Sequence, residues 1–333
     1  MAIVLDGMGS DKYPDPEVEA AIKSSIKLNE EIILVGDENI LAPKLKEQSQ
    51  SQAKVRIVHA PEILNMDEHA VEAARQKPQN SMAIGMNLVK NGEARAFVTA
   101  GNTGAAYFTA VTTLRRIKGV SRPALSVVLP VKNGKALFMD TGANADCRPE
   151  FLLEFAIMGS IYAEKLLNCP NPRVGILANG EEAGKGNELV KAAYPLLQNS
   201  GLNFVGNIEP KDFYSGAVDV LVTDGFTGNV FIKSSEAVAK VITDNLREQI
   251  SASFTRKIGY LLVKPAFVAL KKMLDPGEIG AALLLGVDGY VFIGHGRSDE
   301  RALCNGLALA QRAVDSRILE SIRTEIQEKI STH

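Results

Sequence analysis

Short apolar segments alternate with helical patterns along almost the whole chain, and this alternation constrains the fold more than any other feature. Strands are expected at residues 2–5, 32–35, 55–58, 94–99, 124–129, 136–139, 173–178, 203–206, 217–223 and 290–293. Helical spacing separates most of them, which predicts a mostly parallel sheet covered by helices on both faces. Asn133-Gly134 lies between two of these strands and predicts a hairpin, so the sheet is mixed. We therefore expect a three-layer α/β/α fold.

No linker rich in Pro or Ser divides the 333 residues. We interpret residues 1–333 as one α/β domain with two lobes. A short internal repeat favours two related halves, since the pattern V-T-x-G-x-T-G occurs at Val98–Gly104 and again at Val222–Gly228. Coincidence is the alternative, because strand–turn–helix units draw on few residue types.

The composition is that of an ordinary globular protein, with 46% hydrophobic residues, 23% charged residues and a formal net charge of −2. This charge gives no reason to expect a nucleic-acid partner. Cys147, Cys169 and Cys304 have no C-x-x-C spacing, which fits a reducing compartment. Asp6 interrupts the N-terminal apolar run, and no run approaches the ~20 residues of a membrane-spanning helix. We expect a soluble, cytoplasmic protein.

Glycine-rich polar turns follow six of the expected strands. They are Asp6–Gly9, Gly101–Gly104, Asp140–Asn144, Asn179–Asn187, Asp224–Asn229 and His295–Ser298. A strand that passes through a tight turn into a helix aims backbone N–H groups and the positive helix end at one point, which suits an anion. Any one such turn needs glycine in any case. Together they predict an anion-binding site on one rim of the sheet.

Other site classes lack their motifs. No G-x-G-x-x-G follows the first strand, and Gly180–Gly186 is one residue short of a P-loop and carries two carboxylates. The histidines have no paired spacing, and strand-end aspartates more often cap helices than hold Mg²⁺, so no metal is expected. No G-x-S-x-G motif occurs, and Cys147 is expected to pack. The cations that remain at the turns are Lys185, His295 and Arg297, which suit an anion or an oxyanion.

Several longer motifs resemble the phosphate acyltransferase family, in order and over essentially the whole chain. They are DGMGSD at 6–11, NSM at 80–82, AGNTGA at 100–105, RPAL at 122–125, GANADCRPE at 142–150, NPRVGIL at 171–177, GEE at 180–182, KGNEL at 185–189, TDGFTGNV at 223–230 and HGRSD at 295–299. Gly7, Ser10 and the segment 278–282 depart from the family pattern, which affects local turn geometry and not the activity.

This resemblance implies transfer of a fatty acyl group from acyl carrier protein to inorganic phosphate, giving acyl phosphate for phospholipid synthesis. It also implies a fold like isocitrate/isopropylmalate dehydrogenase and phosphotransacetylase, and a homodimer without a cofactor. The implied location is the bacterial cytoplasm with peripheral attachment to the membrane, where a glycerol-3-phosphate acyltransferase would use the product.

On this basis phosphate attacks the thioester directly in a ternary complex. Lys185 is expected to neutralise phosphate or the oxyanion, Asn229 to orient the reactants, and His295 to protonate the leaving thiolate. The expected phosphate-binding residues are Gly101, Asn102, Thr103, Gly104, Thr227, Gly228 and Arg297. A local cap or turn role is the alternative for these residues.

Two basic segments are expected to meet partners. Residues 253–274 carry five basic residues and no acidic one, and we expect a helical hairpin at about 251–275, divided at Pro265. This hairpin would face a dimer partner or a membrane surface through Tyr260, Leu261, Leu262, Val263 and Lys264. The second segment continues the helix after Gly101–Gly104 to about residue 117 and would dock the acidic carrier protein through Arg115, Arg116, Lys118 and Arg122.

Two other function classes are alternatives. A metal- and NAD-dependent hydroxy-acid dehydrogenase of the same fold would need a cofactor pocket and a carboxylate cluster. A non-enzymatic acyl-chain-binding protein would hold acyl chains without turnover.

Overall fold

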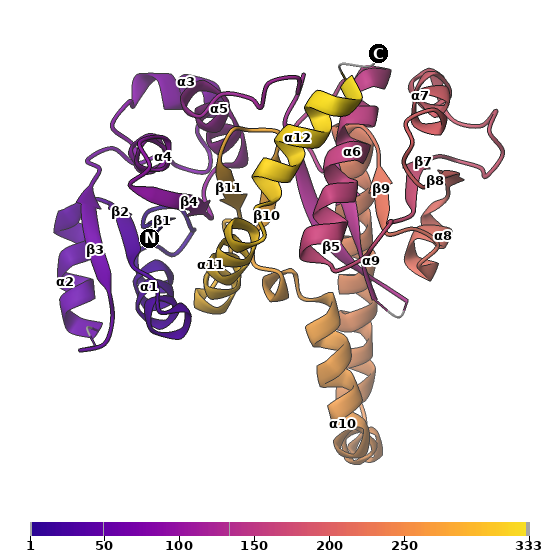
Figure 1. Ribbon diagram of the computed structural model, residues 1–333. Coiled ribbons are helices and arrows are strands. Elements are labelled where there is room, and N and C mark those ends of the chain that lie inside the picture. Colours follow the sequence, from indigo (N-terminus) through magenta and orange to yellow (C-terminus); the bar gives the residue numbers. More distant parts are fainter. Residues whose placement is uncertain (1, 49, 133, 331–333) are drawn as a thin grey trace.

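The computed structural model describes residues 2–48, 50–132 and 134–330, and it contains one large sheet between layers of helices (Figure 1). The strands are β1 (Ala2–Asp6), β2 (Ile32–Gly36), β3 (Val55–His59), β4 (Ala94–Thr99), β5 (Ala124–Val131), β6 (Gly134–Met139), β7 (Val174–Leu177), β8 (Phe204–Ile208), β9 (Val220–Val222), β10 (Ala282–Leu285) and β11 (Tyr290–Ile293). Their order is β3-β2-β1-β4-β11-β10-β5-β6-β9-β7-β8. Most neighbours are parallel, which confirms the predicted mixed sheet.

Three antiparallel pairings in the middle of the sheet separate two parallel blocks. They join β11 to β10, β10 to β5 and β5 to β6. We call β3-β2-β1-β4-β11 the first block and β6-β9-β7-β8 the second block. Three reversals invert the strand direction, so the two blocks end at opposite edges of the sheet. The expectation of one rim for all six turns is therefore wrong, because the β5–β6 hairpin and strand β10 turn the second block around.

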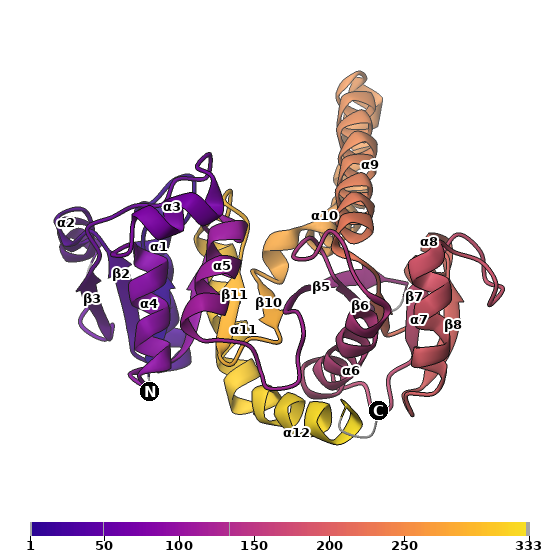
Figure 2. The same cartoon turned by 90° about the horizontal axis from the view of Figure 1, so that it is seen from above.

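Helices cover both faces of the sheet. They are α1 (Asp15–Leu28), α2 (Glu38–Gln48), α3 (Ala70–Gln76), α4 (Ser81–Lys90), α5 (Thr103–Thr113), α6 (Pro149–Leu166), α7 (Glu188–Gln198), α8 (Pro210–Ser215), α9 (Gly225–Ser251), α10 (Phe254–Leu274), α11 (Glu300–Asp315) and α12 (Ile318–Ile330), with a 3₁₀ turn, η1, at Pro276–Glu278. Helices α1, α6, α7, α11 and α12 form one layer, and Figure 2 shows α6 and α12 running below the sheet in that view.

The core follows from the period of two in each strand. In β1, Ile3 and Leu5 face the cluster under α1 and α11, whereas Ala2 and Val4 face the cluster formed with α3, α4 and α5. Both sets are buried, so the strand is apolar at every position up to Asp6. This is why the parallel strands could be recognised as continuous apolar runs.

Several boundaries differ from the expected ones. Helix α5 ends at Thr113, and Arg115 is left-handed at φ 73°, so the expected continuation to 117 is wrong. Arg317, at φ 53°, separates α11 from α12. Strand β10 and helix α8 were not expected, since β10 has only 4 residues and α8 only 6. The β5–β6 pairing confirms the hairpin, while Asn133 lies outside the described residues.

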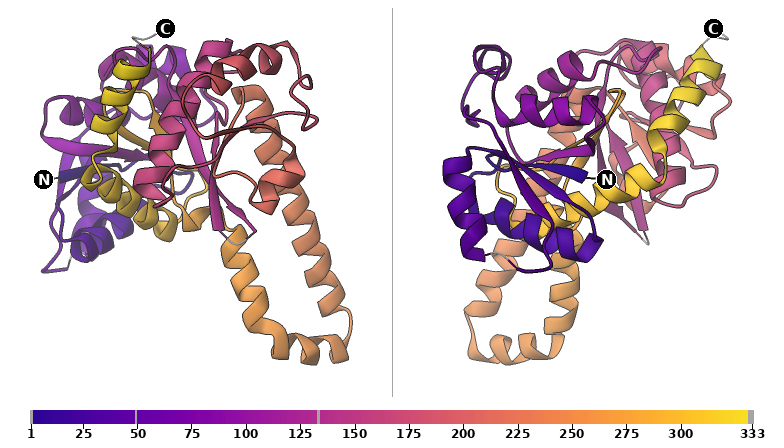
Figure 3. Two further views of the ribbon diagram at one scale, coloured as in Figure 1. Left: turned by 45° about the vertical axis from the view of Figure 1, so that its right-hand side comes forward. Right: turned by 60° about the vertical axis from the view of Figure 1, so that its left-hand side comes forward.

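Helices α9 and α10 leave the sheet together and form a long projection (Figure 3). Helix α10 runs through Pro265 without the expected division into two helices. No residue of α10 is buried, and in α9 only Gly225 and Gly228 are. Among the described residues, no helix is both long enough and apolar enough to cross a membrane.

Glu17 is a fully buried carboxyl group in the first turn of α1, with an exposed fraction of 0%. Its Oε1 accepts a hydrogen bond from the Ser10 N–H at 2.9 Å, whereas Oε2 has no partner among the described residues. Burial raises the pKa of Glu17 from 4.5 to about 7, and the neighbouring Asp6 charge acts in the same direction. The folded state therefore binds a proton that the unfolded state has lost between these two pH values.

We predict that this proton makes stability depend on pH in a defined direction. The pKa of Glu17 is about 7 in the folded state and 4.5 in the unfolded state, so the free energy of unfolding of the wild type should fall by up to ~3 kcal/mol as the pH rises from 5 to 8. Glu17→Gln keeps an acceptor for Ser10 and removes the titration, so its free energy of unfolding should fall less over the same interval. Urea unfolding at both pH values measures this, and the same pH dependence in both proteins would contradict the assignment.

Candidate active site

The Asp140 carboxylate, directly after β6, organises the turn at the end of the second block. It is fully buried and accepts five hydrogen bonds from N–H groups. Oδ1 accepts from the backbone of Leu125, Gly142 and Ala143 at 3.0, 3.3 and 3.1 Å. Oδ2 accepts from the backbone and side chain of Asn144 at 2.7 and 2.9 Å. Burial raises the pKa of Asp140, and these donors oppose that rise.

The start of α9 packs directly on this turn. The Asn229 Nδ2 donates to the Thr141 carbonyl at 3.1 Å, which fixes the amide and leaves its Oδ1 without a hydrogen bond among the described residues. Gly228 lies so close to the Asp140 carbonyl that a Cβ would sit 1.9 Å from the oxygen. Gly228 is therefore required for the approach of α9 to the turn, which is a packing reason for this glycine.

Two of the N–H groups at the start of α9, those of Gly225 and Thr227, are already engaged. Asp224 caps the helix, and its carboxylate accepts from the Thr227 N–H and hydroxyl at 2.8 and 2.7 Å. The Gly225 N–H donates to the Asn144 carbonyl at 2.7 Å. A carboxylate thus occupies the positive end of α9, and it would repel a phosphate bound at Thr227.

The first block repeats this arrangement around Asp6, which follows the same kind of strand. Its Oδ1 accepts from the Met8 N–H at 3.1 Å, and its Oδ2 from the Thr99 hydroxyl at 2.7 Å. The Thr99 oxygen in turn accepts from the Gly101 N–H at 2.9 Å. Burial raises the pKa of Asp6. In both blocks a buried aspartate thus supports the turn that carries the V-T-x-G-x-T-G pattern on a parallel neighbour.

The start of α5 differs from that of α9 because it is open. Asn102 caps the helix by accepting from the Ala105 N–H at 3.1 Å, and its Nδ2 donates to the Met66 and Glu68 carbonyls at 3.2 and 3.4 Å. Thr103 and Gly104 are exposed. Their N–H groups precede the first intrahelical bond, so they can receive an anion.

The loop between β11 and α11 lies against the first-block turns. The Gly294 N–H donates to the Thr99 carbonyl, and the Asp11 N–H to the Gly296 carbonyl, both at 2.7 Å. The Arg297 guanidinium is 3.8 Å from a carboxylate oxygen of Glu236, which belongs to α9. This ion pair joins the first block to the helix that begins at the Asp140 turn.

His295 lies in the same loop and keeps part of its surface open to solvent. The protein around the ring restricts its hydration and lowers the pKa of His295, and Arg297 acts in the same direction while Glu236 opposes both. The neutral ring therefore dominates at pH 7.

Lys185 lies in the loop between β7 and α7 and is exposed. The loop is held at its base, where the Gly186 N–H donates to Asn179 Oδ1 at 3.0 Å and the Asn207 Nδ2 to the Glu182 carbonyl at 2.7 Å. Within the described residues, no hydrogen bond or ion pair joins Lys185 to Asn229 or His295. The structure brings Asn229 to the Asp140 turn and His295 to the first block, and it leaves Lys185 on a separate loop.

Nucleophile and metal chemistry find little support in the same region. Burial raises the pKa of Cys147 to about 12, so its thiolate is scarce at neutral pH. Among the described residues, the one cluster of acidic side chains close enough together to share a metal ion is Glu181, Glu209 and Asp212. The Lys211 Nζ lies 3.4 Å from a carboxylate oxygen of Glu181 and 2.6 Å from one of Glu209. These carboxylates already have a cationic partner.

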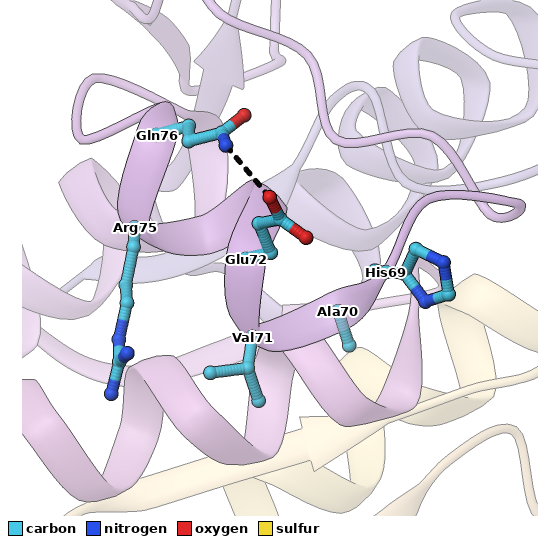
Figure 4. Close-up of a pocket in the computed structure, with 6 residues that line it drawn as sticks. All are labelled: His69, Ala70, Val71, Glu72, Arg75 and Gln76. Atoms are coloured by element: carbon cyan, nitrogen blue, oxygen red, sulfur yellow. Dashed lines mark hydrogen bonds between the residues drawn. The ribbon is translucent and has the colours of Figure 1, made fainter.

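A shallow hollow lies along helix α3, and six side chains line it: His69, Ala70, Val71, Glu72, Arg75 and Gln76 (Figure 4). Arg75 reaches over the Phe108 ring of α5 at 5.3 Å. None of the residues expected in the site lines this hollow.

The residues expected to meet partners are exposed, except Tyr260, which is half-buried. Arg115, Arg116, Lys118 and Arg122 lie on the loop that follows α5, and the first three line a second hollow there. In α10, Leu261 and Leu262 are 67% and 83% exposed, and Tyr260 packs on Phe267 with ring centres 5.3 Å apart.

Sequence comparison places the chain among known proteins. Residues 1–321 match the family described as "Fatty acid synthesis protein". The chain belongs to this family. A "Phosphate acyltransferase" from Pelotomaculum thermopropionicum is 46% identical over 327 residues, covering 98% of this chain and 95% of that protein. A "Phosphate acyltransferase" from Elusimicrobium minutum is 44% identical and covers 98% and 96%.

Solved structures support the fold. A phosphotransacetylase from Streptococcus pyogenes superimposes with a TM-score of 0.60 at 17% identity, covering 96% of this chain and 94% of that chain. A 4-hydroxythreonine-4-phosphate dehydrogenase from Klebsiella pneumoniae gives 0.50 at 15% identity, covering 94% and 98%. The likeness confirms the expected phosphotransacetylase-like fold and says nothing further about activity.

Proposed function

We propose that this chain transfers a fatty acyl group from acyl carrier protein to inorganic phosphate and releases acyl phosphate for phospholipid synthesis. The observation that carries the proposal is the identity of 46% and 44% over nearly the full length to relatives named phosphate acyltransferase. Acyl transfer is favoured over the dehydrogenase alternative, because the dehydrogenase likeness lies in the fold alone at 15% identity. An acyl-chain-binding protein without turnover is not favoured by these relatives.

We place the phosphate at the start of α5. The open N–H groups of Thr103 and Gly104 favour an anion there, and Arg297 lies on the neighbouring loop. In this assignment Thr227 and Gly228 do not bind the phosphate, because the Thr227 N–H and hydroxyl donate to the Asp224 carboxylate and the Gly228 N–H donates to the Asp224 carbonyl. Gly101 and Asn102 hold the turn in place.

In the proposed reaction a phosphate oxygen attacks the thioester carbonyl, the C–S bond breaks, and the thiolate leaves. Phosphate is already an oxyanion at pH 7, so no strong base is needed. Alignment of two reactants is worth about 7–11 kcal/mol, and an oxyanion donor about 3–4 kcal/mol. Asn229 would orient the reactants, Lys185 would stabilise developing charge once its loop approaches, and His295 would assist departure of the thiolate.

We further propose that the loop after α5 docks the acidic carrier protein through Arg115, Arg116 and Lys118. These cations are exposed and follow directly from the helix whose start holds phosphate in this proposal. Local positive charge is needed there, because the net charge of −2 would not attract an acidic partner.

We propose that a second copy of the chain and a membrane surface share the α9–α10 projection. Val238, Val241 and Ile242 of α9 are 56–60% exposed on one face, which suits a homodimer contact. Leu261, Leu262 and Lys264 of α10 combine apolar and basic character, which suits an anionic membrane. A cytoplasmic enzyme held at the membrane in this way could pass acyl phosphate to a membrane glycerol-3-phosphate acyltransferase.

The activity is tested by mixing acyl carrier protein thioester with phosphate and trapping acyl phosphate with hydroxylamine. We expect product with the wild type, and at least a 100-fold loss in kcat/KM for Lys185→Ala and Asn229→Ala, the size expected for one oxyanion donor or positioning group. Both variants should keep the wild-type melting temperature, since Lys185 is exposed and Asn229 contributes one hydrogen bond. Absence of product with the wild type would refute the proposed function, and wild-type turnover in either variant would remove that residue from the chemistry.

The membrane surface is tested by flotation with vesicles rich in anionic lipid. Replacing Leu261, Leu262 and Val263 by Ser removes three neighbouring exposed apolar side chains of α10, so we expect the variant to remain in the unbound fraction. Val205→Ser, at a 45% exposed valine of β8, is the matched control and should float like the wild type. Unchanged flotation of the triple variant would make this segment purely structural.

A further inference from the structure

Helix α9 carries three polar side chains on one face within its first three and a half turns. They are Asn229, Lys233 and Glu236, which follow one another at intervals of four and three residues. This spacing places side chains above one another on a single face of an α-helix. None of the three is buried. We call this the polar face of α9, and it is open beside the helix.

Both ends of the polar face have defined neighbours. At one end, the Asn229 Nδ2 donates to the Thr141 carbonyl of the Asp140 turn at 3.1 Å. At the other end, a carboxylate oxygen of Glu236 lies 3.8 Å from the Arg297 guanidinium, in the loop after β11. Lys233 is about one helical turn from each of these two residues. Its side chain therefore leaves α9 between the Asp140 turn and the loop after β11.

Lys233 is exposed, and its charge has no partner within residues 2–48, 50–132 and 134–330. Its ammonium group makes no hydrogen bond and no ion pair there. Glu236 is near enough in the helix to pair with Lys233, but its carboxylate is directed to Arg297 instead. A cation that neither packs nor pairs is available to a ligand.

The internal repeat shows that a helix of this kind can use the same face for packing. When the two V-T-x-G-x-T-G patterns are aligned, Ala105 and Thr109 of α5 stand at the positions of Asn229 and Lys233. Both are buried, with exposed fractions of 1% and 4%. The second copy of the unit thus has an amide and a cation on an open face where the first copy has a packed one, which favours a binding role for these two side chains.

An anion beside α9 depends on side-chain cations, because the start of the helix does not favour one. The Asp224 carboxylate occupies that start and accepts from the Thr227 N–H and hydroxyl. Lys233 is the first cation that follows in α9. Lysine binds phosphate oxygens as a compact point charge, and Arg297 on the neighbouring loop adds a second positive charge.

We infer that Lys233 is a substrate-binding residue whose ammonium group pairs with a phosphate group of the reactants, between α9 and the loop after β11. The inference rests on the proposed function and deepens it by adding a cation on the face that carries Asn229. The phosphate group is either inorganic phosphate or the phosphodiester of the carrier arm, since both present the same oxygens to an ammonium group.

The test compares the Michaelis constants of Lys233→Gln and the wild type. Phosphate is varied with each of three donors, and each donor is varied at saturating phosphate: acyl carrier protein thioester, acyl-phosphopantetheine, and acyl-pantetheine, which has no phosphate. Loss of one charge-assisted bond should raise the relevant KM about 10- to 100-fold. Lys233→Arg keeps the charge, so its KM should lie closer to that of the wild type.

Lys240→Gln is the matched control, because Lys240 is an exposed lysine of the same helix, one turn beyond Glu236 and farther from Asn229. We expect wild-type constants for it. All three variants should keep the wild-type melting temperature, since both lysines are exposed.

A rise in the KM for phosphate with all three donors supports the inference and identifies inorganic phosphate as the ligand. A rise in the KM for acyl-phosphopantetheine, with the constants for acyl-pantetheine and phosphate unchanged, supports it and identifies the phosphodiester of the arm. Unchanged constants overturn it, as does a change confined to kcat or to the KM for the carrier protein. Failure of the proposed function is distinct, because the wild type would then give no acyl phosphate with any donor.

Discussion

The buried carboxylate of Asp140 is the interaction on which the candidate site depends. A charge taken out of water at the end of β6 is tolerated because five N–H donors surround it. Those donors belong to the turn itself and to the start of β5, so the carboxylate ties together two strands that run in opposite directions. Asn229 and the start of β5 are then held relative to each other, although they lie far apart in the sequence.

Asp6 plays the same part in the first block, but the two neighbouring helix starts differ. Around Asp6 the neighbouring helix start is open, whereas around Asp140 it is closed by the Asp224 carboxylate. An anion is therefore favoured at the first helix start and disfavoured at the second. The Arg297–Glu236 pair joins the loop after β11 to α9 about three turns after the start of that helix.

The layers, the hairpin and most strands could be predicted from the sequence, because buried parallel strands are continuous apolar runs such as Ile3–Leu5. The direction of the second block could not be predicted from the sequence. It depends on β10, a strand of four residues that pairs antiparallel with β11 and with the distant β5. The turns at Gly101 and Asp224 were found from their glycine pattern, but the pattern does not reveal that an acidic cap closes one of them. The hydrogen bonds from Ser121 to Glu154 and from Asn144 to the Pro123 carbonyl have no pattern in the sequence, because their partners lie far apart along the chain.

The central claim is that phosphate attacks the thioester while both are bound, without an acyl-enzyme. The most direct measurement is thiol exchange: acyl carrier protein thioester is incubated with the enzyme and isotopically labelled free carrier protein, with phosphate left out. A direct mechanism predicts no label in the thioester under these conditions, because no acyl group leaves its carrier until phosphate is present. Label that enters the thioester without phosphate would show an acyl-enzyme and contradict the account.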